Sequence, residues 1–115
     1  MTELEALLLS AAIEAPVGYL IVRMARWPGR GALHAGFAAA VATAVTHPQL
    51  WAAAEWAYPR FGYWPSVGGL EAAVVLVEGG LIAWMASLPL HRAMLVSLAA
   101  NAASCAAGLL IQGLA

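Results

Sequence analysis

The sequence predicts an all-α, polytopic integral membrane protein built as a bundle of four transmembrane helices. Of its 115 residues, 63% are hydrophobic and only 10% are charged, whereas soluble domains carry roughly 25% charged residues. The apolar residues fall into four segments, each near the ~20 residues that cross the hydrocarbon core of a bilayer. Proline, glycine and arginine separate the segments, which indicates turns at the membrane surface. A chain of this length is expected to form a single transmembrane domain, 1–115.

The first segment runs from about residue 4 to residue 24. Its start is acidic where a signal peptide would be basic, so we expect a retained helix. The second segment covers 32–47, after the Pro-Gly break in RMARWPGRG (23–31). Pro48 disfavours helical geometry at His47, which leaves two alternatives. In the first, the span ends at His47 and 49–58 forms a short interfacial helix. In the second, the helix kinks at Pro48 and continues to about residue 57. The many aromatic residues between 51 and 64 are typical of an interfacial belt and favour the first alternative.

A loop over 59–67 is predicted next, followed by a third segment over 68–87 and a fourth over 93–114. The placement of arginine predicts the orientation. The first and third loops together hold four arginines, whereas the second holds only Arg60; the four are Arg23, Arg26, Arg30 and Arg92. We therefore expect the first and third loops in the cytoplasm, both termini on the outer side, and a multi-pass location in a bacterial inner membrane.

The third segment carries two carboxylates, Glu71 and Glu78, inside its apolar run. They are seven residues apart, so on a helix both project from nearly one face, about 10 Å apart along the axis. A carboxylate in hydrocarbon is costly and must face protein or water. Glu14 in the first segment and Asn101 in the fourth fall at about the depth of Glu78. The sequence therefore predicts an intramembrane ion-binding site made of Glu14, Glu78, Glu71 and Asn101.

Small and polar residues recur at helical spacing on the other segments as well. The stripes are Ser10, Glu14 and Gly18; Gly36, Ala40, Thr43 and His47; and Ser97, Asn101, Ser104 and Gly108. Such residues allow close helix contact and interhelical hydrogen bonds. His47, Glu71 and Glu78 also supply the nitrogen and oxygen ligands that suit a divalent metal ion, which is the one cofactor that the sequence suggests. A purely structural reading stays open for each: protonated glutamates can tie helices together, and His47 can cap a helix at the interface.

Three functions fit this pattern. The favoured one is the binding and passage of a cation, a proton or a metal ion, by a homo-oligomer, most simply a dimer. The first alternative is a non-catalytic accessory subunit of a larger membrane complex, and the second is a metal-dependent membrane enzyme. The sequence contains no G-x-S-x-G, H-E-x-x-H, paired C-x-x-C or phosphate-loop motif. A net charge of −1 excludes a basic nucleic-acid-binding surface. His34, His91 and Glu55 are expected at the surface, and Cys105 as a small buried hydrophobe.

The stretch SAAIEAPVGY places a lone glutamate, Glu14, in the middle of the first span. In this respect the chain resembles the small multidrug resistance transporters, which also have four spans. The resemblance implies that Glu14 would bind protons or a cationic substrate in a dimer. Pro16 and the two acids of the third span depart from that family's pattern, and WPSVG (64–68) precedes the third span here, where those transporters place a similar segment at the second. We use the likeness as an analogy.

Overall fold

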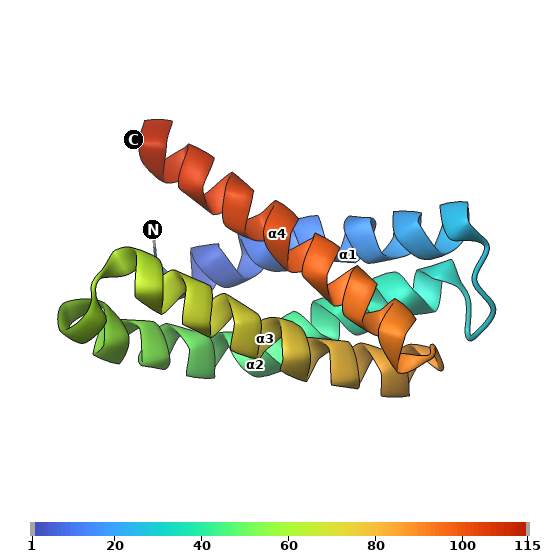
Figure 1. Cartoon of the computed structure of the whole chain (residues 1–115). Helices are drawn as coiled ribbons and strands as arrows, with labels where there is room; N and C mark the ends of the chain where they lie inside the picture. Colours follow the sequence, from blue (N-terminus) through green and yellow to red (C-terminus); the bar gives the residue numbers. More distant parts are fainter. Residues whose placement is uncertain (1, 115) are drawn as a thin grey trace.

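The computed structural model describes residues 2–114, and the side chains of residues 2–113. The chain forms four helices, α1 (Glu3–Ala25), α2 (Ala32–Phe61), α3 (Tyr63–Ala86) and α4 (Leu90–Leu114). Consecutive helices run in opposite directions, so the start of α1 and the end of α4 lie toward the same end of the bundle as the α2–α3 turn (Figure 1). We call this the terminal end, and we call the opposite end, formed by 26–31 and 87–89, the loop end. No strand occurs within 2–114, which confirms the all-α class.

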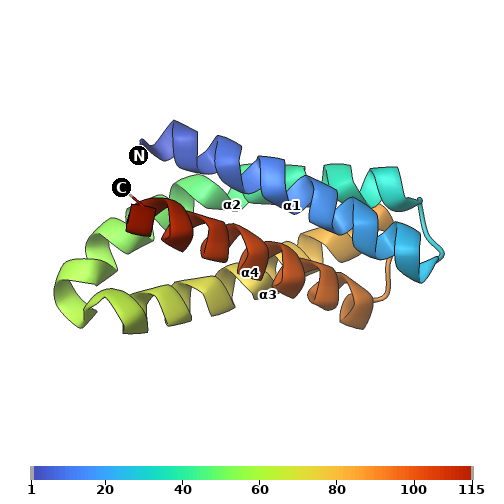
Figure 2. The ribbon, with the colours of Figure 1, turned by 90° about the horizontal axis from the view of Figure 1, so that it is seen from above.

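The helices form a closed ring of contacts. α1 packs on α2, α2 on α3, α3 on α4, and α4 returns to α1; Figure 2 shows the ring from a second side. α1 begins with a capping box, in which the Thr2 hydroxyl accepts a hydrogen bond from the Glu5 backbone N–H at 3.2 Å. This cap satisfies backbone donors that a helix start leaves unpaired. α1 covers the predicted segment 4–24, and Pro16 lies inside it.

The second helix does not end at His47, so the expected break at Pro48 and the separate interfacial helix over 49–58 are wrong. α2 continues from Ala32 to Phe61 with Pro48 inside it. A proline removes one backbone donor, but neighbouring side chains can satisfy the freed carbonyls of a membrane helix. The Gln49 amide, oriented as its hydrogen bonding requires, donates from Nε2 to the Val45 carbonyl at 2.6 Å and to the Thr46 carbonyl at 3.2 Å. Pro48 leaves the Ala44 carbonyl without its helical donor, so the Gln49 bonds strengthen the adjacent turn and do not replace the missing bond.

The predicted loop over 59–67 is also replaced by helix. α2 and α3 meet at Gly62, which caps both helices with φ 82° and ψ 171°. A positive φ of this kind favours glycine, because a Cβ would be strained there. Pro65 falls in the first turn of α3, where a missing N–H removes no helical hydrogen bond. The third and fourth helices thus begin at Tyr63 and Leu90, a few residues before the predicted segments 68–87 and 93–114.

Small residues bring α1 and α2 into close contact. A Cβ at Gly36 would lie 2.8 Å from the Ala15 carbonyl oxygen, and one at Gly18 would lie 3.3 Å from the Ala35 carbonyl oxygen. The loop half of the bundle is filled by an apolar core that is rich in alanine. Its members are Val22, Ala35, Ala38, Ala39, Ala42, Ile82, Ala86, Leu88, Ala93 and Val96. The buried charged residues of the described chain, Glu14 and Glu78, lie outside this half.

The distribution of residues is the reverse of that in a water-soluble bundle. Large apolar side chains such as Leu20, Phe37, Leu76 and Leu98 are exposed, whereas glutamate, threonine and asparagine are buried. An apolar exterior suits lipid, because hydrocarbon does not penalise exposed leucine or phenylalanine. Three helices are long and apolar enough to cross a membrane: Glu3–Ala25, Tyr63–Ala86 and Leu90–Gly113. The chain is therefore described best as a membrane-embedded helical protein.

Candidate functional site

Buried polar side chains from all four helices meet near the middle of the bundle. α1 contributes Glu14, α3 contributes Glu78, and the other two helices contribute the remaining members, which are Thr43 and Thr46 on α2 and Ser97 and Asn101 on α4. Glu14 and Glu78 are each only 2% exposed. We call these six residues the polar centre. The structure thus brings together Glu14, Glu78 and Asn101, three of the four residues predicted to bind an ion.

Glu78 is held by hydrogen bonds from two neighbouring helices. The Thr46 hydroxyl donates to Oε2 at 2.6 Å, and the Asn101 amide donates from Nδ2 to Oε1 at 3.2 Å. Asn101 is itself oriented by a bond from Nδ2 to the Ser97 carbonyl at 2.9 Å, and the Ser97 hydroxyl donates to the Val75 carbonyl of α3 at 2.9 Å. Glu78 therefore ties α2, α3 and α4 together, which is how buried polar groups stabilise a bundle that lacks a hydrophobic driving force.

Glu14 is placed differently. Its carboxyl group lies beside that of Glu78, with the hydroxyls of Thr43 and Ser104 nearby. Both hydroxyls donate to carbonyls of their own helices, Thr43 to Ala39 at 3.0 Å and Ser104 to Asn101 at 3.1 Å. Oε1 of Glu14 is buried and has no hydrogen-bond partner among the described residues. A buried polar atom without a partner is costly, so Glu14 offers an oxygen that a proton or a bound cation could satisfy.

Two uncompensated negative charges side by side are strongly unfavourable in a low-dielectric interior. The arginines that could neutralise them lie outside the polar centre, at the ends of the helices or in the loops. A pair of adjacent carboxyl groups commonly titrates as a unit and shares one proton. The geometry of the Glu14–Glu78 pair therefore suits a single positive charge, delivered to the oxygen of Glu14 that lacks a partner.

A pocket of about 400 Å³ lies between the polar centre and the terminal end. α2 contributes His47, Trp51 and Tyr58 to its lining, α3 contributes Glu71, and α4 contributes Gln112. His47 is only 6% exposed, and its Nε2 has no hydrogen-bond partner among the described residues. His47 directly follows Thr46, the residue that donates to Glu78. The pocket therefore extends from His47 to the terminal end, and its lining includes none of the six residues of the polar centre.

The predicted metal ligands His47, Glu71 and Glu78 are not assembled into one site. Glu78 lies in the polar centre, and Glu71 is a half-buried residue of the pocket, about two helical turns away. No group of three His, Cys, Asp or Glu side chains within the described part of the chain is arranged to hold a metal ion. The predicted metal site at these three residues is therefore not supported.

Three further residues were expected at the surface of the protein, and the structure places them there. His34, His91 and Glu55 are exposed, and Glu55 accepts a hydrogen bond from the Trp51 indole at 3.1 Å on the rim of the pocket. Cys105 is half-buried in an apolar groove between α3 and α4.

Thr46 is the member of the polar centre that sequence reasoning missed. The predicted polar stripe of the second segment includes Thr43 and His47, whose spacing follows steps of three and four residues. Thr46 is three residues after Thr43, so the same rule of helical spacing permits it. Thr46 nevertheless makes the shorter of the two hydrogen bonds that Glu78 accepts.

Comparison of the chain with protein-family models, with curated proteins and with solved structures finds no match. The likeness between Glu14 and the acidic residue of the small multidrug resistance transporters accordingly remains an analogy.

Proposed function

We propose that this protein binds a monovalent cation, most simply a proton, at the Glu14–Glu78 pair and passes it through the membrane. One observation carries the proposal: Glu14 is buried beside a second carboxyl group, and its Oε1 has no hydrogen-bond partner among residues 2–113. A purely structural carboxyl group would be expected to satisfy both of its oxygens. Intramembrane carboxylates commonly mark ion and proton pathways, and the pair has the chemistry to take up and release one charge.

The proposed route to the pair begins at the terminal end. The pocket holds Glu71 and His47 between that end and the polar centre, and an imidazole can pass a proton from one nitrogen to the other. The apolar core of the loop half would close the other side of the pair. Passage through the membrane then requires a second state, in which the loop half opens and the pocket closes.

The proposed topology has four spans, with α2 crossing the membrane beside the three more apolar helices. Support comes from the ring of contacts, in which α2 packs between α1 and α3, and from its buried residues Thr43 and Thr46, which belong to the polar centre. The loop end holds Arg23, Arg26, Arg30 and Arg92 and would face the cytoplasm of a bacterial cell, whereas both termini would lie outside. We further propose a homodimer, because four helices leave only a thin wall around a pathway.

A second function is favoured by the state of Glu78. Both of its oxygens accept hydrogen bonds from other helices, as expected of a residue that only fixes packing. In that case the protein would be an accessory subunit of a larger membrane complex, and its exposed apolar faces would contact partner helices rather than lipid.

The experiment that separates the two functions is proton uptake into vesicles. Purified protein is reconstituted into liposomes that contain a pH-sensitive dye, and a potassium gradient with valinomycin imposes a negative interior. Wild-type protein is expected to acidify the lumen faster than protein-free vesicles do. Glu14→Gln should reduce the rate to that of protein-free vesicles, because the amide cannot take up and release a proton.

Glu3→Gln is the matched control, since Glu3 is exposed and lines neither the polar centre nor the pocket. It should retain the wild-type rate. An accessory subunit would show no uptake above the protein-free rate in any variant. Equal rates for wild type and Glu14→Gln would refute the role of the pair, even if the protein carries protons by another route.

A further inference from the structure

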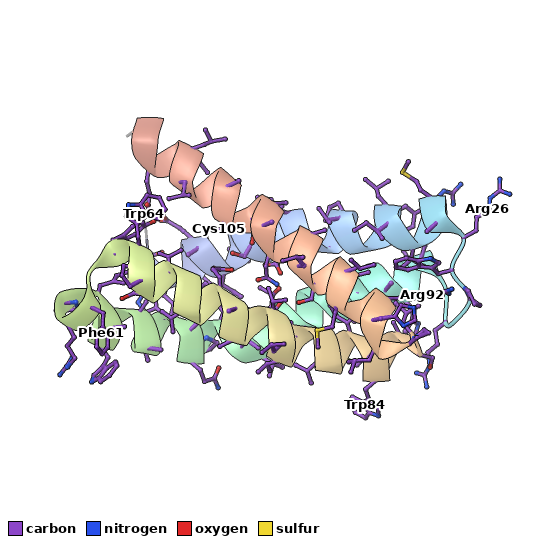
Figure 3. The ribbon with its side chains drawn as sticks, in the orientation of Figure 1. Arg26, Phe61, Trp64, Trp84, Arg92 and Cys105 are labelled. Atoms are coloured by element: carbon purple, nitrogen blue, oxygen red, sulfur yellow. The ribbon has the colours of Figure 1, made fainter. Side chains whose placement is uncertain are left out.

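The loop end of the bundle carries positive charge without nearby acidic side chains. Four of the five arginines lie there, together with two histidines: Arg23, Arg26, Arg30, Arg92, His34 and His91. The six glutamates lie in the middle of the bundle or toward the terminal end, at Glu3, Glu5, Glu14, Glu55, Glu71 and Glu78. Figure 3 shows Arg26 and Arg92 at one end, and Phe61 and Trp64 at the other. The loop end is therefore a surface that attracts anions.

Arg30 is fixed at this end by contacts with α3 and the loop that follows it. Its backbone N–H donates to the Ala86 carbonyl at 3.1 Å, and its Nε donates to the Ser87 hydroxyl at 3.1 Å. The second bond uses only Nε, so the guanidinium still has its Nη donors for a ligand. A guanidinium held in place loses less entropy when it binds a phosphate than a free side chain does.

A groove of about 260 Å³ lies between α2 and α3 beside Arg30. Arg30 and His34 line it toward the loop end, and its apolar lining includes Phe37, Val41, Trp84 and Met85. His34 and Val41 are seven residues apart on α2, so the groove extends about 10 Å along the helix axis. It passes from a charged mouth to an apolar interior as it follows the helix away from the loop end.

The apolar part of the groove opens onto the surface of the bundle that we assign to lipid. Phe37 is 73% exposed and Trp84 is 77% exposed, and Trp84 projects away from the bundle in Figure 3. Arg92 lies over the Trp27 ring at 5.3 Å, which keeps a further positive charge at the same end. Positive charge beside a lipid-facing apolar groove complements a molecule with an anionic head and a hydrocarbon tail.

We propose that this groove binds an anionic phospholipid. The phosphate accepts hydrogen bonds from Arg30 and His34, and one acyl chain lies against Phe37, Val41 and Trp84. The lipid belongs to the leaflet that the loop end faces. A soluble anion would gain only the charged contacts, whereas a zwitterionic lipid would bring a second positive charge to an end that already has a surplus. This inference does not depend on proton passage, because the groove and the polar centre share no residue.

The test measures the lipid that purified protein retains, by native mass spectrometry. The protein is incubated in detergent with equal amounts of palmitoyl-oleoyl phosphatidylglycerol and palmitoyl-oleoyl phosphatidylcholine. Wild-type protein is expected to retain the phosphatidylglycerol preferentially. Arg30→Gln should weaken its binding about fivefold, the value for one arginine near an anionic membrane surface. Arg60→Gln is the matched control, because Arg60 lies at the terminal end, and it should change the affinity less than twofold.

Val41→Trp tests the apolar part of the groove without changing the charge, and it should also weaken phosphatidylglycerol binding. If circular dichroism shows that Arg30→Gln does not fold, Val41→Trp takes its place in the test. Equal retention of the two lipids by wild type, or equal weakening by Arg30→Gln and Arg60→Gln, would overturn the proposal. Displacement of the lipid by the same concentration of glycerol 3-phosphate would also overturn it, because the site would then recognise the phosphate alone.

Discussion

Replacing Thr46 with valine removes the hydroxyl that bonds to Glu78, together with its contact to the Ala42 carbonyl of its own helix at 3.0 Å. Valine has nearly the shape of threonine but no hydroxyl, so Glu78 Oε2 loses its donor at 2.6 Å. An unsatisfied buried acceptor costs about 1–3 kcal/mol, while interhelical bonds in membrane proteins average about 0.6 and reach about 1.7 kcal/mol. We expect a loss of about 1–2 kcal/mol in the free energy of unfolding, toward the upper part of the membrane range because the acceptor is a buried carboxyl group.

Thr43→Val is the control. Thr43 is on the same helix and is also buried, but its hydroxyl donates to the Ala39 carbonyl of its own helix. Valine there removes this intrahelical bond and the hydroxyl beside Glu14 but leaves both donors of Glu78 in place, so the loss should be smaller than that of Thr46→Val. Unfolding is followed by circular dichroism as the fraction of sodium dodecyl sulfate in mixed micelles is raised.

A double-mutant cycle between Thr46→Val and Glu78→Gln completes the measurement. The two residues are in direct contact, so their effects should not add, and the coupling should be about 0.5–1.5 kcal/mol. The reasoning fails if Thr43→Val costs as much as Thr46→Val. It also fails if the two changes of the cycle are additive, because Thr46 would then stabilise the bundle without acting through Glu78.

Four further predictions concern the α1–α2 contact, Pro48, His47 and the orientation in the membrane. Gly36→Val should destabilise the α1–α2 pair by about 1–3 kcal/mol, because a Cβ would lie 2.8 Å from the Ala15 carbonyl oxygen; Gly80→Ala, where the added Cβ meets open space, should be neutral or stabilising in the same unfolding assay. Pro48→Ala should leave the helical circular dichroism unchanged, since α2 already continues through that position. His47→Ala should slow proton uptake without changing the unfolding midpoint by more than the Thr43→Val control does. Alkaline phosphatase fused to the C-terminus should be active, and a cytoplasmic reporter fused there should not, if both termini lie outside.

The parts of the fold that the sequence predicts well depend on periodicity and composition. Four helices follow from four apolar segments, and Glu14, Glu78 and Asn101 meet because each lies at mid-segment on the polar face of its helix. Depth in a membrane and helical spacing are nearly sufficient to place such residues, since a buried acid can face only the interior of the bundle.

The parts that the sequence does not predict depend on contacts distant from the local pattern. Pro48 disfavours a helix locally, but α2 continues through it and packs between two other helices. Gly62 replaces a nine-residue loop with one residue, because its positive φ turns the chain sharply between two helix ends. Neither effect leaves a periodic signal, so local propensity alone gives the wrong helix boundaries.

The buried polar residues that hold the helices together are also the residues of the candidate site. In lipid, helix association depends on close packing and polar contacts rather than on the exclusion of water. Glu78 supplies those contacts through Thr46 and Asn101, so the loss of either partner should weaken the bundle. Within the described part of the chain, Glu14 accepts no such bond through Oε1, so we expect its replacement to affect packing less. Under the proposed function, this difference between the two carboxyl groups would allow the pair to exchange a proton while the bundle stays assembled. It also explains why neutralising Glu14 should remove transport at little cost in stability, whereas disturbing the partners of Glu78 should weaken the fold itself.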